Sequence, residues 1–362
     1  MDLPRITRES FFSTLSRDKK PWQEAYLAMY STQWEGYTTD PALMMVPADD
    51  HLVHRGDGVF DVMRCLGGKI YQMEAHLSRL ERSAKAISLS FPRAYEKIRE
   101  IIKEMVRRGG ERDCIIRIIL SRGPGGFTTN PFECPSSQIY VNIIRHPVYP
   151  AQYYSEGISV VTSRIPIKKS FFATTKSCNY LENVLMKMEA INLGFSYSVG
   201  LDEQGNLAEG STENVGIVTS EGILKFPGFD NTLAGITVQR VAALAETLVR
   251  EKTLREVQFD KIALEEAYES AEVFLTGTSI RILPVVSYDG RDIGTRRPGP
   301  VYSRLLQLLD QDARENHSLL TEISWEADKT FPPRSCFQVS VDVEEFKSSK
   351  STAIFREPIP RP

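Results

Sequence analysis

The chain has 362 residues, of which 41% are hydrophobic and 25% are charged, and its formal net charge is -3 at pH 7. This length predicts about two domains, and the composition is that of an average globular protein. Nucleic acid is not an expected partner, because the sequence has no basic excess to neutralise phosphates. The five cysteines and five histidines show no zinc-ligand spacing, so we expect neither a disulfide framework nor a metal site.

The sequence contains no apolar run of the roughly 18 residues that a membrane-spanning helix needs, so we expect no membrane partner. The first residues, MDLPRITRESFFSTLSRDKKP, lack the continuous apolar segment of a secretory signal. Asp2 and Glu9 fit an organelle transit peptide poorly. These features favour the cytoplasm.

The first half of the chain mixes strand and helix patterns. Apolar and β-branched runs predict strands over 42–47, 58–66, 114–121 and 137–144. Apolar residues recur at helical spacing over 74–89 and 95–106. Residues 145–157 then carry two prolines and no periodicity, which is typical of a linker between domains.

The second half begins with a predicted strand over 158–167 and a helix that ends at Gly194. Asn179 and Glu182 have capping-box spacing at the start of this helix. Its apolar residues predict a buried stripe made of Leu181, Val184, Leu185 and Met188.

Short strands with turns follow over 196–227, and the segment 272–286 is typical of a strand, a tight glycine turn and a second strand. We expect further helices over 235–249 and 300–313. Beyond 316 the chain is polar and proline-rich, and we assign this tail no role.

Two segments could bind a phosphate group. In LAGITVQRV a glycine precedes an amphipathic helix, which leaves the backbone N–H groups of Ile236 and Thr237 free to bind an anion. In TGTSI a glycine-hinged turn presents the hydroxyls of Thr278 and Ser279. Each segment taken alone is more typical of an ordinary helix start or an ordinary turn.

Lys176 and Glu209 are the candidate chemical groups. Lys176 stands four residues before Tyr180, just outside the helix that follows, and is either a solvated lysine or a nucleophile. Glu209 at a strand end is either a surface glutamate or a carboxylate that holds a proton on a pyridine nitrogen. Two phosphate cradles near a nucleophilic lysine indicate a phosphorylated aldehyde cofactor.

Together these motifs resemble a known family. KSCNYLENVL, GNLAEGSTENV, LAGIT and TGTS stand in the order and spacing of the class IV, fold-type IV, pyridoxal-phosphate aminotransferases. HRGDGVFDVMR and HLSRLERSA in the first half are similar to two further motifs of that family. The resemblance covers roughly residues 37–310, and the segment before Asp61 looks closest to the plant-type D-amino-acid aminotransferase and aminodeoxychorismate lyase group.

The resemblance implies a two-domain fold of the α+β or α/β class, fold-type IV, with the cofactor between the domains. A small α/β domain would cover 37–148 and a larger barrel-like domain 149–316. Residues 1–36 would form an N-terminal extension and 317–362 a C-terminal tail. Family members are homodimers, so the resemblance also implies a homodimer whose small-domain loops complete the partner's pocket.

The resemblance implies a cofactor, pyridoxal 5′-phosphate, and the residues that bind it. Lys176 would form the Schiff base, Tyr180 would bind the 3′-oxygen and Glu209 the pyridinium nitrogen. The 5′-phosphate would be held by Arg79, by the amides of Ile236 and Thr237, and by Thr278.

The substrate pocket departs from several family patterns. Bacillus-type D-amino-acid enzymes place an arginine and a histidine where this chain has Phe127 and Thr129, so that carboxylate trap is missing. Bacterial branched-chain enzymes carry a tyrosine where this chain has Ile115. The remaining candidate substrate-binding residues are Phe60, Arg55, Arg117 and Ser279, and the two arginines are equally typical of structural ion pairs.

Three functions remain open from the sequence. The first is an aminotransferase for small or branched-chain amino acids, L or D, with 2-oxoglutarate or pyruvate as the acceptor. The second is a 4-amino-4-deoxychorismate lyase that releases pyruvate and 4-aminobenzoate. The third is a non-catalytic protein that has kept the fold. We favour the first.

Overall fold

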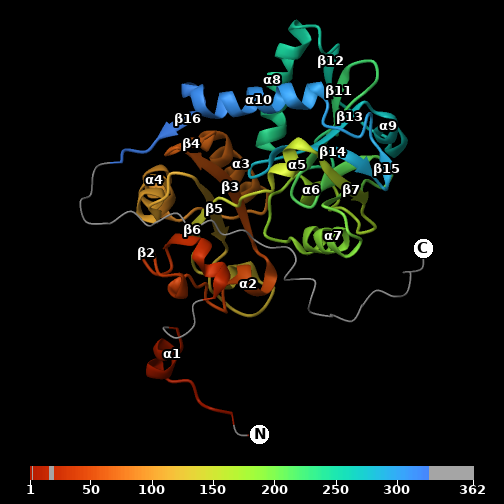
Figure 1. Cartoon of the computed structure of the whole chain (residues 1–362). Coiled ribbons are helices and arrows are strands. Elements are labelled where there is room, and N and C mark those ends of the chain that lie inside the picture. Colours follow the sequence, from red (N-terminus) through yellow and green to blue (C-terminus); the bar gives the residue numbers. More distant parts are fainter. Residues whose placement is uncertain (2, 16–19, 326–362) are drawn as a thin grey trace. The chain divides into compact units, whose positions relative to one another are not determined.

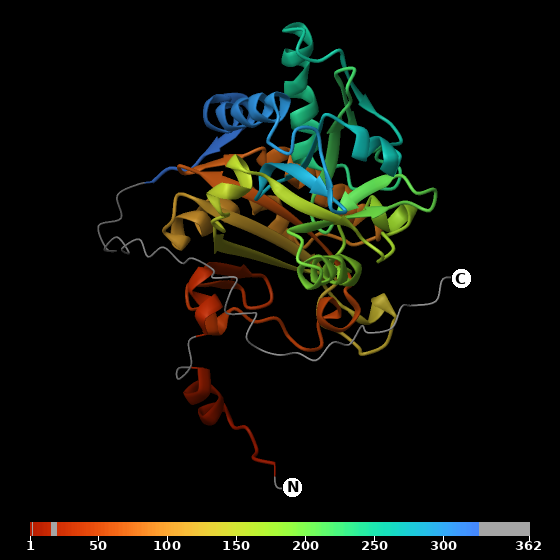
Figure 2. The same cartoon turned by 45° about the vertical axis from the view of Figure 1, so that its right-hand side comes forward.

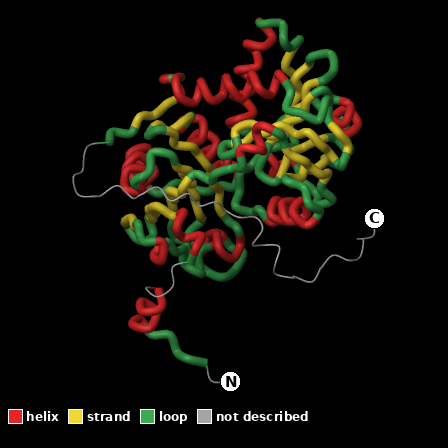
Figure 3. Tube along the Cα trace, viewed as in Figure 1, coloured by secondary structure: helices red, strands yellow, loops and turns green. Residues whose placement is uncertain are grey.

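The computed structural model of this protein contains two β-sheets with helices packed against them (Figure 1). It describes residues 1, 3–15 and 20–325. Most of the C-terminal tail expected from 317 onward lies outside the described residues. In Figure 3 the strands form two groups, with helices around them.

Among the described residues the first sheet has seven strands in the order β16-β4-β3-β5-β6-β1-β2, all antiparallel. Its strands are β1 (Tyr26–Ser31), β2 (Gly36–Thr38), β3 (Gly58–Leu66), β4 (Lys69–Tyr71), β5 (Cys114–Ser121), β6 (Gln138–Arg145) and β16 (Leu320–Glu322). Helices α3 (Met73–Ala86) and α4 (Ile98–Gly109) cover one face, and their apolar residues join the buried core of this sheet.

Strand β3 alternates between the two faces of the first sheet. Val59, Asp61 and Met63 are buried toward the helices, whereas Phe60 and Val62 are only partly buried on the other face. Phe60 therefore lies on the face that α3 and α4 leave uncovered.

The second sheet has nine strands. They are β7 (Ile158–Thr162), β8 (Tyr197–Leu201), β9 (Leu207–Gly210), β10 (Asn214–Val218), β11 (Ile223–Phe226), β12 (Glu256–Phe259), β13 (Glu272–Gly277), β14 (Arg281–Tyr288) and β15 (Arg291–Asp292). Eight of them have the order β12-β11-β10-β13-β14-β7-β8-β9, and β15 pairs with β14 beside this path. Strand β9 also pairs with β10, which closes the sheet into a barrel-like ring.

Six α-helices lie in the second half of the described chain, and four of them contribute apolar residues to the clusters of the second sheet. The six are α5 (Ala151–Ser155), α6 (Ser170–Ala173), α7 (Leu181–Asn192), α8 (Ile236–Arg250), α9 (Leu264–Glu269) and α10 (Pro300–Glu315). The remaining α-helices are α1 (Arg8–Leu15) and α2 (His51–Arg55). Helix α10 lies against α8 in Figures 1 and 2, and both contribute buried residues to one apolar cluster.

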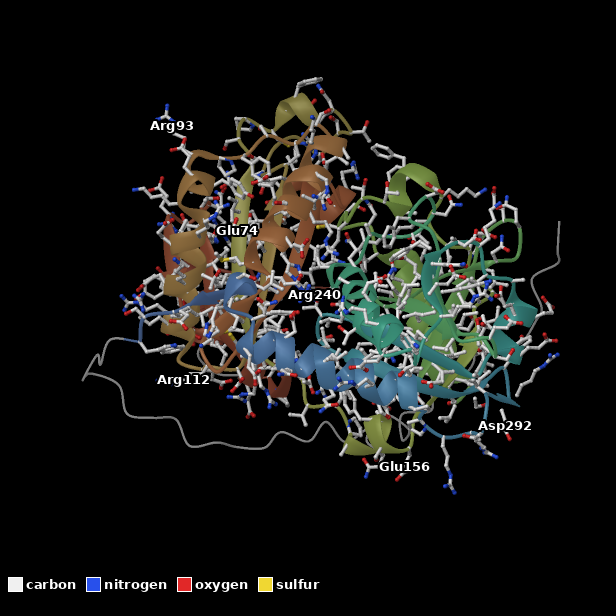
Figure 4. All side chains as sticks on the ribbon, turned by 90° about the horizontal axis from the view of Figure 1, so that it is seen from above. Glu74, Arg93, Arg112, Glu156, Arg240 and Asp292 are labelled. Atoms are coloured by element: carbon white, nitrogen blue, oxygen red, sulfur yellow. The ribbon has the colours of Figure 1, made fainter. Side chains whose placement is uncertain are left out.

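Asp312 on α10 joins three elements. Its carboxylate pairs with Arg240, which Figure 4 shows on α8 close to α10. It also accepts a hydrogen bond from the hydroxyl of Tyr71 on β4. This contact ties the first sheet to the helices that pack on the second.

The structure corrects the strand expected over 42–47. Residues Pro41–Leu43 form a 3₁₀ turn, because the side chain of Asp40 accepts a hydrogen bond from the amide of Ala42. Two strands come from segments that we expected to lie outside the domains: β1 pairs with β6 and with the edge strand β2, and β16 pairs with β4.

The buried stripe expected on α7 is also wrong. Leu181 and Val184 are 69% and 59% exposed. The opposite face is buried, because Asn183 donates a 2.7 Å hydrogen bond to the carbonyl of Ser211 and Glu189 accepts one from Ser163. Polar contacts therefore orient this helix and leave its apolar face exposed. Its N-cap is Tyr180 rather than the expected Asn179.

None of the helices in the described part of the chain is long and apolar enough to cross a membrane.

Candidate active site

Lys176 is held between the two sheets by its backbone. Its carbonyl accepts a 3.0 Å hydrogen bond from the amide of Phe60 on β3. Its amide donates a 3.2 Å hydrogen bond to the hydroxyl of Ser83 on α3. The segment before α7 is therefore fixed against the first sheet, and the Lys176 side chain begins at a defined position.

The amine of Lys176 lies in a polar cluster. Its Nζ lies 3.1 Å from the Tyr180 hydroxyl and 4.7 Å from the centre of the Phe60 ring. Burial, followed by the positive charge of Arg79, lowers the pKa of Lys176 to about 8. Near physiological pH a minority of this amine is therefore neutral, but far more than for an ordinary lysine with a pKa of about 10.4, and the neutral form is the one that a nucleophile or general base requires.

Tyr180 presents a neutral phenol beside that amine. Burial, and then the charge of Glu209, raises the pKa of Tyr180 well above its usual range. Its ring packs edge-to-face on Phe60 with the centroids 5.0 Å apart. Tyr180 can therefore donate a hydrogen bond from a fixed position.

Glu209 lies at the end of β9 and lines the same cavity as Lys176 and Tyr180. One carboxylate oxygen accepts a 3.1 Å hydrogen bond from the amide of Leu233. Burial raises the pKa of Glu209. This carboxylate would be stabilised by a cationic N–H group placed in the cavity.

The start of α8 is open to an anion. Gly235 is the N-cap, and no side chain of the described residues caps this end. A Cβ atom at position 235 would lie only 2.0 Å from Oδ1 of Asn214, so only glycine allows this close approach. Thr237 and Thr278 line a second cavity next to this helix start.

Arg79 is positioned by a buried carboxylate. Asp61 accepts two 2.8 Å hydrogen bonds from Arg79, and His76 Nδ1 lies 2.7 Å from the same carboxylate. Burial alone would raise the pKa of Asp61, but Arg79 and His76 hold it well below its usual range. The outer nitrogen of Arg79 approaches the carbonyl of Ala234, just before α8. Arg79 is thus aimed at the helix start.

The structure brings some of the expected substrate residues to the site. Phe60 packs against Lys176 and Tyr180, and the guanidinium of Arg117 lies 5.6 Å from the Phe60 ring centre. Ser279 lines neither of the two cavities, although Thr278 before it lines the second, and its hydroxyl accepts a hydrogen bond from Tyr149.

Arg55 is not brought to the site. Its guanidinium donates to the backbone carbonyls of Phe127 and Thr128, and among the described residues it lines neither cavity.

Sequence reasoning missed Asp61, His76 and Lys168. Asp61 and His76 are buried and fix Arg79, and Lys168 lines the cavity at Lys176. A charged residue at a buried position of a strand, as Asp61 is in β3, was the available signal.

The donor set fits pyridoxal 5′-phosphate. The neutral amine of Lys176 suits its aldehyde, the phenol of Tyr180 its 3′-oxygen, and the carboxylate of Glu209 its ring nitrogen. The uncapped start of α8 and the nearby threonine hydroxyls suit a phosphate group.

Known proteins resemble this chain over most of its length. Residues 58–288 match the family model described as "Amino-transferase class IV". A D-amino-acid transaminase, chloroplastic, from Arabidopsis thaliana is 40% identical over 297 residues, which cover 80% of this chain and 78% of that protein. A branched-chain-amino-acid aminotransferase from Escherichia coli is 30% identical over 269 residues, which cover 71% of this chain and 84% of that protein.

A solved structure also superimposes on the chain. The branched-chain amino acid aminotransferase of T.th., solved with pyridoxamine 5′-phosphate, has a TM-score of 0.76 and 28% identity, and covers 83% of this chain and 99% of its own. These comparisons confirm the fold class, fold-type IV, that the sequence motifs indicated.

Proposed function

Because the chain belongs to the class IV aminotransferases, which are pyridoxal 5′-phosphate-dependent enzymes, we propose that it transfers an amino group between a small or branched-chain amino acid and a 2-oxoacid such as 2-oxoglutarate or pyruvate. The arrangement of Lys176, Tyr180 and Glu209 in one cavity carries this proposal. The Arabidopsis relative is named a D-amino-acid transaminase, which makes D-amino acids the first substrates to test.

When bound, the cofactor supplies an aldehyde that takes up the amino group and a ring that withdraws electrons from the substrate Cα. We assign Lys176 as the Schiff-base lysine and as the base that moves the Cα proton, since its pKa of about 8 suits both roles. Tyr180 donates to the 3′-oxygen, and Glu209 accepts from the ring N–H.

The 5′-phosphate lies at the start of α8 in this proposal. The amides of Ile236 and Thr237 and the hydroxyl of Thr278 bind its oxygens, and Arg79 supplies the positive charge. Asp61 keeps the Arg79 guanidinium in place.

We assign Phe60 as the wall of the substrate pocket, Arg117 as the partner of a distal carboxylate, and the amide of Ser279 as a donor to a carboxylate. Arg55 is left out of the substrate set, because its donors are bound to the carbonyls of Phe127 and Thr128.

A homodimer is part of the proposal. The apolar face of α7 is exposed and includes Val184 and Ile191, and the neighbouring Phe171 and Phe172 are also exposed. Such a surface is typical of a protein interface. Size-exclusion chromatography with light scattering tests this, and a monomer at working concentration contradicts it.

The cytoplasm is our proposal for the compartment. The Arabidopsis relative is named chloroplastic, so imaging of the full chain fused to a fluorescent protein at its C-terminus is the appropriate test. Signal in an organelle contradicts the proposal.

The activity is tested by recording the visible spectrum of the holoenzyme before and after adding D-alanine, L-alanine or L-leucine. Loss of the visible absorbance band of the holoenzyme with one of them, and its recovery with a 2-oxoacid, supports amino transfer. Release of pyruvate from aminodeoxychorismate without an acceptor supports the lyase instead. The feature that favours the lyase is SRGPGG over 121–126, which resembles the SRGxGG of bacterial lyases, although Phe127 stands where those enzymes have an arginine.

The covalent lysine is tested by borohydride reduction and peptide mapping. Lys176→Ala should yield no adduct, whereas Lys168→Ala should keep the adduct at position 176. An adduct at position 168 in the unchanged protein contradicts the assignment.

A further inference from the structure

Lys168 is a second lysine in the cavity of Lys176, and none of the roles given above uses it. It lies in the loop between β7 and α6 and lines the cavity together with Tyr180 and Glu209. Its Nζ lies 4.1 Å from the centre of the Tyr180 ring, and the Nζ of Lys176 lies 5.6 Å from the same point. Two amines therefore approach one aromatic ring.

The ammonium of Lys168 has no anionic partner within the described part of the chain. It is half-buried and makes neither a hydrogen bond nor an ion pair with those residues. Burial lowers the pKa of Lys168, while Glu209 and Glu182 raise it from beyond ion-pair distance. Apart from the Tyr180 ring the ammonium has no partner among the described residues, and a partly buried cation without an anionic partner costs free energy, so an anion that enters the cavity would be stabilised there.

The anions of the cofactor have other partners in the proposed arrangement. Its phosphate lies at the start of α8, and its 3′-oxygen is bound by Tyr180. The anion that remains is the α-carboxylate of the substrate. That group is attached to the same carbon as the reacting nitrogen, so it must lie close to Lys176. Phe127 and Thr129 stand where related enzymes carry a basic carboxylate trap, and the Ser279 amide supplies a donor without a charge.

We propose that Lys168 binds the α-carboxylate of the substrate through a charge-assisted hydrogen bond. This inference rests on the proposed aminotransferase function. Lys168 is then a substrate-binding residue that complements the neutral donor of Ser279, whereas Lys176 remains the reacting amine.

The neighbouring residue provides a matched control. Lys169 is exposed, pairs with Glu203 and does not line the cavity. Lys168→Gln, Lys168→Arg and Lys169→Gln are compared with the unchanged protein as holoenzymes.

Calorimetry measures the binding of 4-methylvalerate, a branched carboxylate that has no amino or oxo group and therefore cannot react. Lys168→Gln should weaken this binding about tenfold or more, Lys168→Arg should restore most of it, and Lys169→Gln should bind as the unchanged protein does. The corresponding alcohol, which lacks the charge, should bind all four proteins alike.

The affinity of the four apoproteins for pyridoxal 5′-phosphate is the second readout. Lys168→Gln should leave it unchanged, because the cofactor does not depend on Lys168 in this arrangement. The inference is overturned if Lys168→Gln binds 4-methylvalerate normally, or if it loses cofactor affinity instead. Failure of the unchanged protein to transfer amino groups is a separate result, and it rejects the proposed function itself.

Discussion

Asp61 and Arg79 form a buried ion pair in which each carboxylate oxygen accepts a 2.8 Å hydrogen bond from the guanidinium. His76 approaches the same carboxylate from α3 at 2.7 Å. The pair joins the buried face of β3 to the helix that packs on it. It leaves the outer nitrogen of Arg79 directed toward the carbonyl that precedes α8. A structural ion pair thus determines where Arg79 points, the residue that we propose as a ligand of the phosphate.

Removing the charge of Asp61 should destabilise the protein. Asp61→Asn leaves Arg79 buried without its anion, and the loss of one partner from a buried pair costs about 3–5 kcal/mol in the free energy of unfolding. Urea denaturation of the apoprotein measures this. Glu104→Gln, which removes an exposed partner of Arg107 and Arg108, should cost less than about 1 kcal/mol. Equal losses in the two variants would contradict the structural role of Asp61.

The reaction of the apoprotein with pyridoxal 5′-phosphate should depend on the protonation of Lys176. Only the neutral amine attacks an aldehyde, and burial lowers the pKa of this group to about 8. The rate at which the visible absorbance band appears should therefore rise with pH, reach half its maximum near pH 8 and then level off. A rise that continues toward about pH 10.4, where an ordinary lysine titrates, would show that the amine is not desolvated.

Most of the fold could be predicted from periodicity, and the wrong prediction for α7 has a physical cause. The patterns located α3, α4, α8 and α10, whose apolar residues face the cores. The pattern on α7 was equally clear, but the helix is turned by hydrogen bonds from Asn183 to Ser211 and from Ser163 to Glu189. Such contacts join residues far apart in the sequence, so periodicity does not reveal them.

The residues of the site likewise fall into two groups, those that the sequence motifs predicted and those that only the structure revealed. Lys176, Tyr180 and Glu209 stand in recognisable motifs, and the structure places them around one cavity. Asp61 lies 18 positions before Arg79, which it supports, and Lys168 lies in the loop between β7 and α6, where the sequence has no periodicity. Their importance comes from the side chains opposite them, which only the fold brings together.

Glu209→Gln should slow amino transfer while the cofactor remains bound. Glutamine occupies nearly the same volume, but it cannot stabilise a proton on the ring nitrogen by its charge, and the ring then withdraws electrons less strongly. We expect kcat to fall about 100-fold or more, with little change in the affinity of the apoprotein for pyridoxal 5′-phosphate. Stopped-flow single-turnover spectra measure the step. Glu203→Gln, at an exposed position paired with Lys169, serves as the control. A kcat within a factor of two of the unchanged protein would remove Glu209 from the mechanism.

Arg117→Leu should affect the KM for 2-oxoglutarate but not the KM for pyruvate, the two candidate amino-group acceptors. Arg117 is exposed on the open face of the first sheet, 5.6 Å from the Phe60 ring, and makes no ion pair with the residues that the structure describes. A distal carboxylate, which 2-oxoglutarate has and pyruvate lacks, would bind this guanidinium. The KM for 2-oxoglutarate should therefore rise about tenfold, the equivalent of about 1.4 kcal/mol, and the KM for pyruvate should not change. Arg112→Leu, at the arginine beside Trp325, should alter neither value. An equal rise in KM for both acceptors would assign Arg117 to the α-carboxylate. Arg117 would then replace Lys168 in the role proposed above.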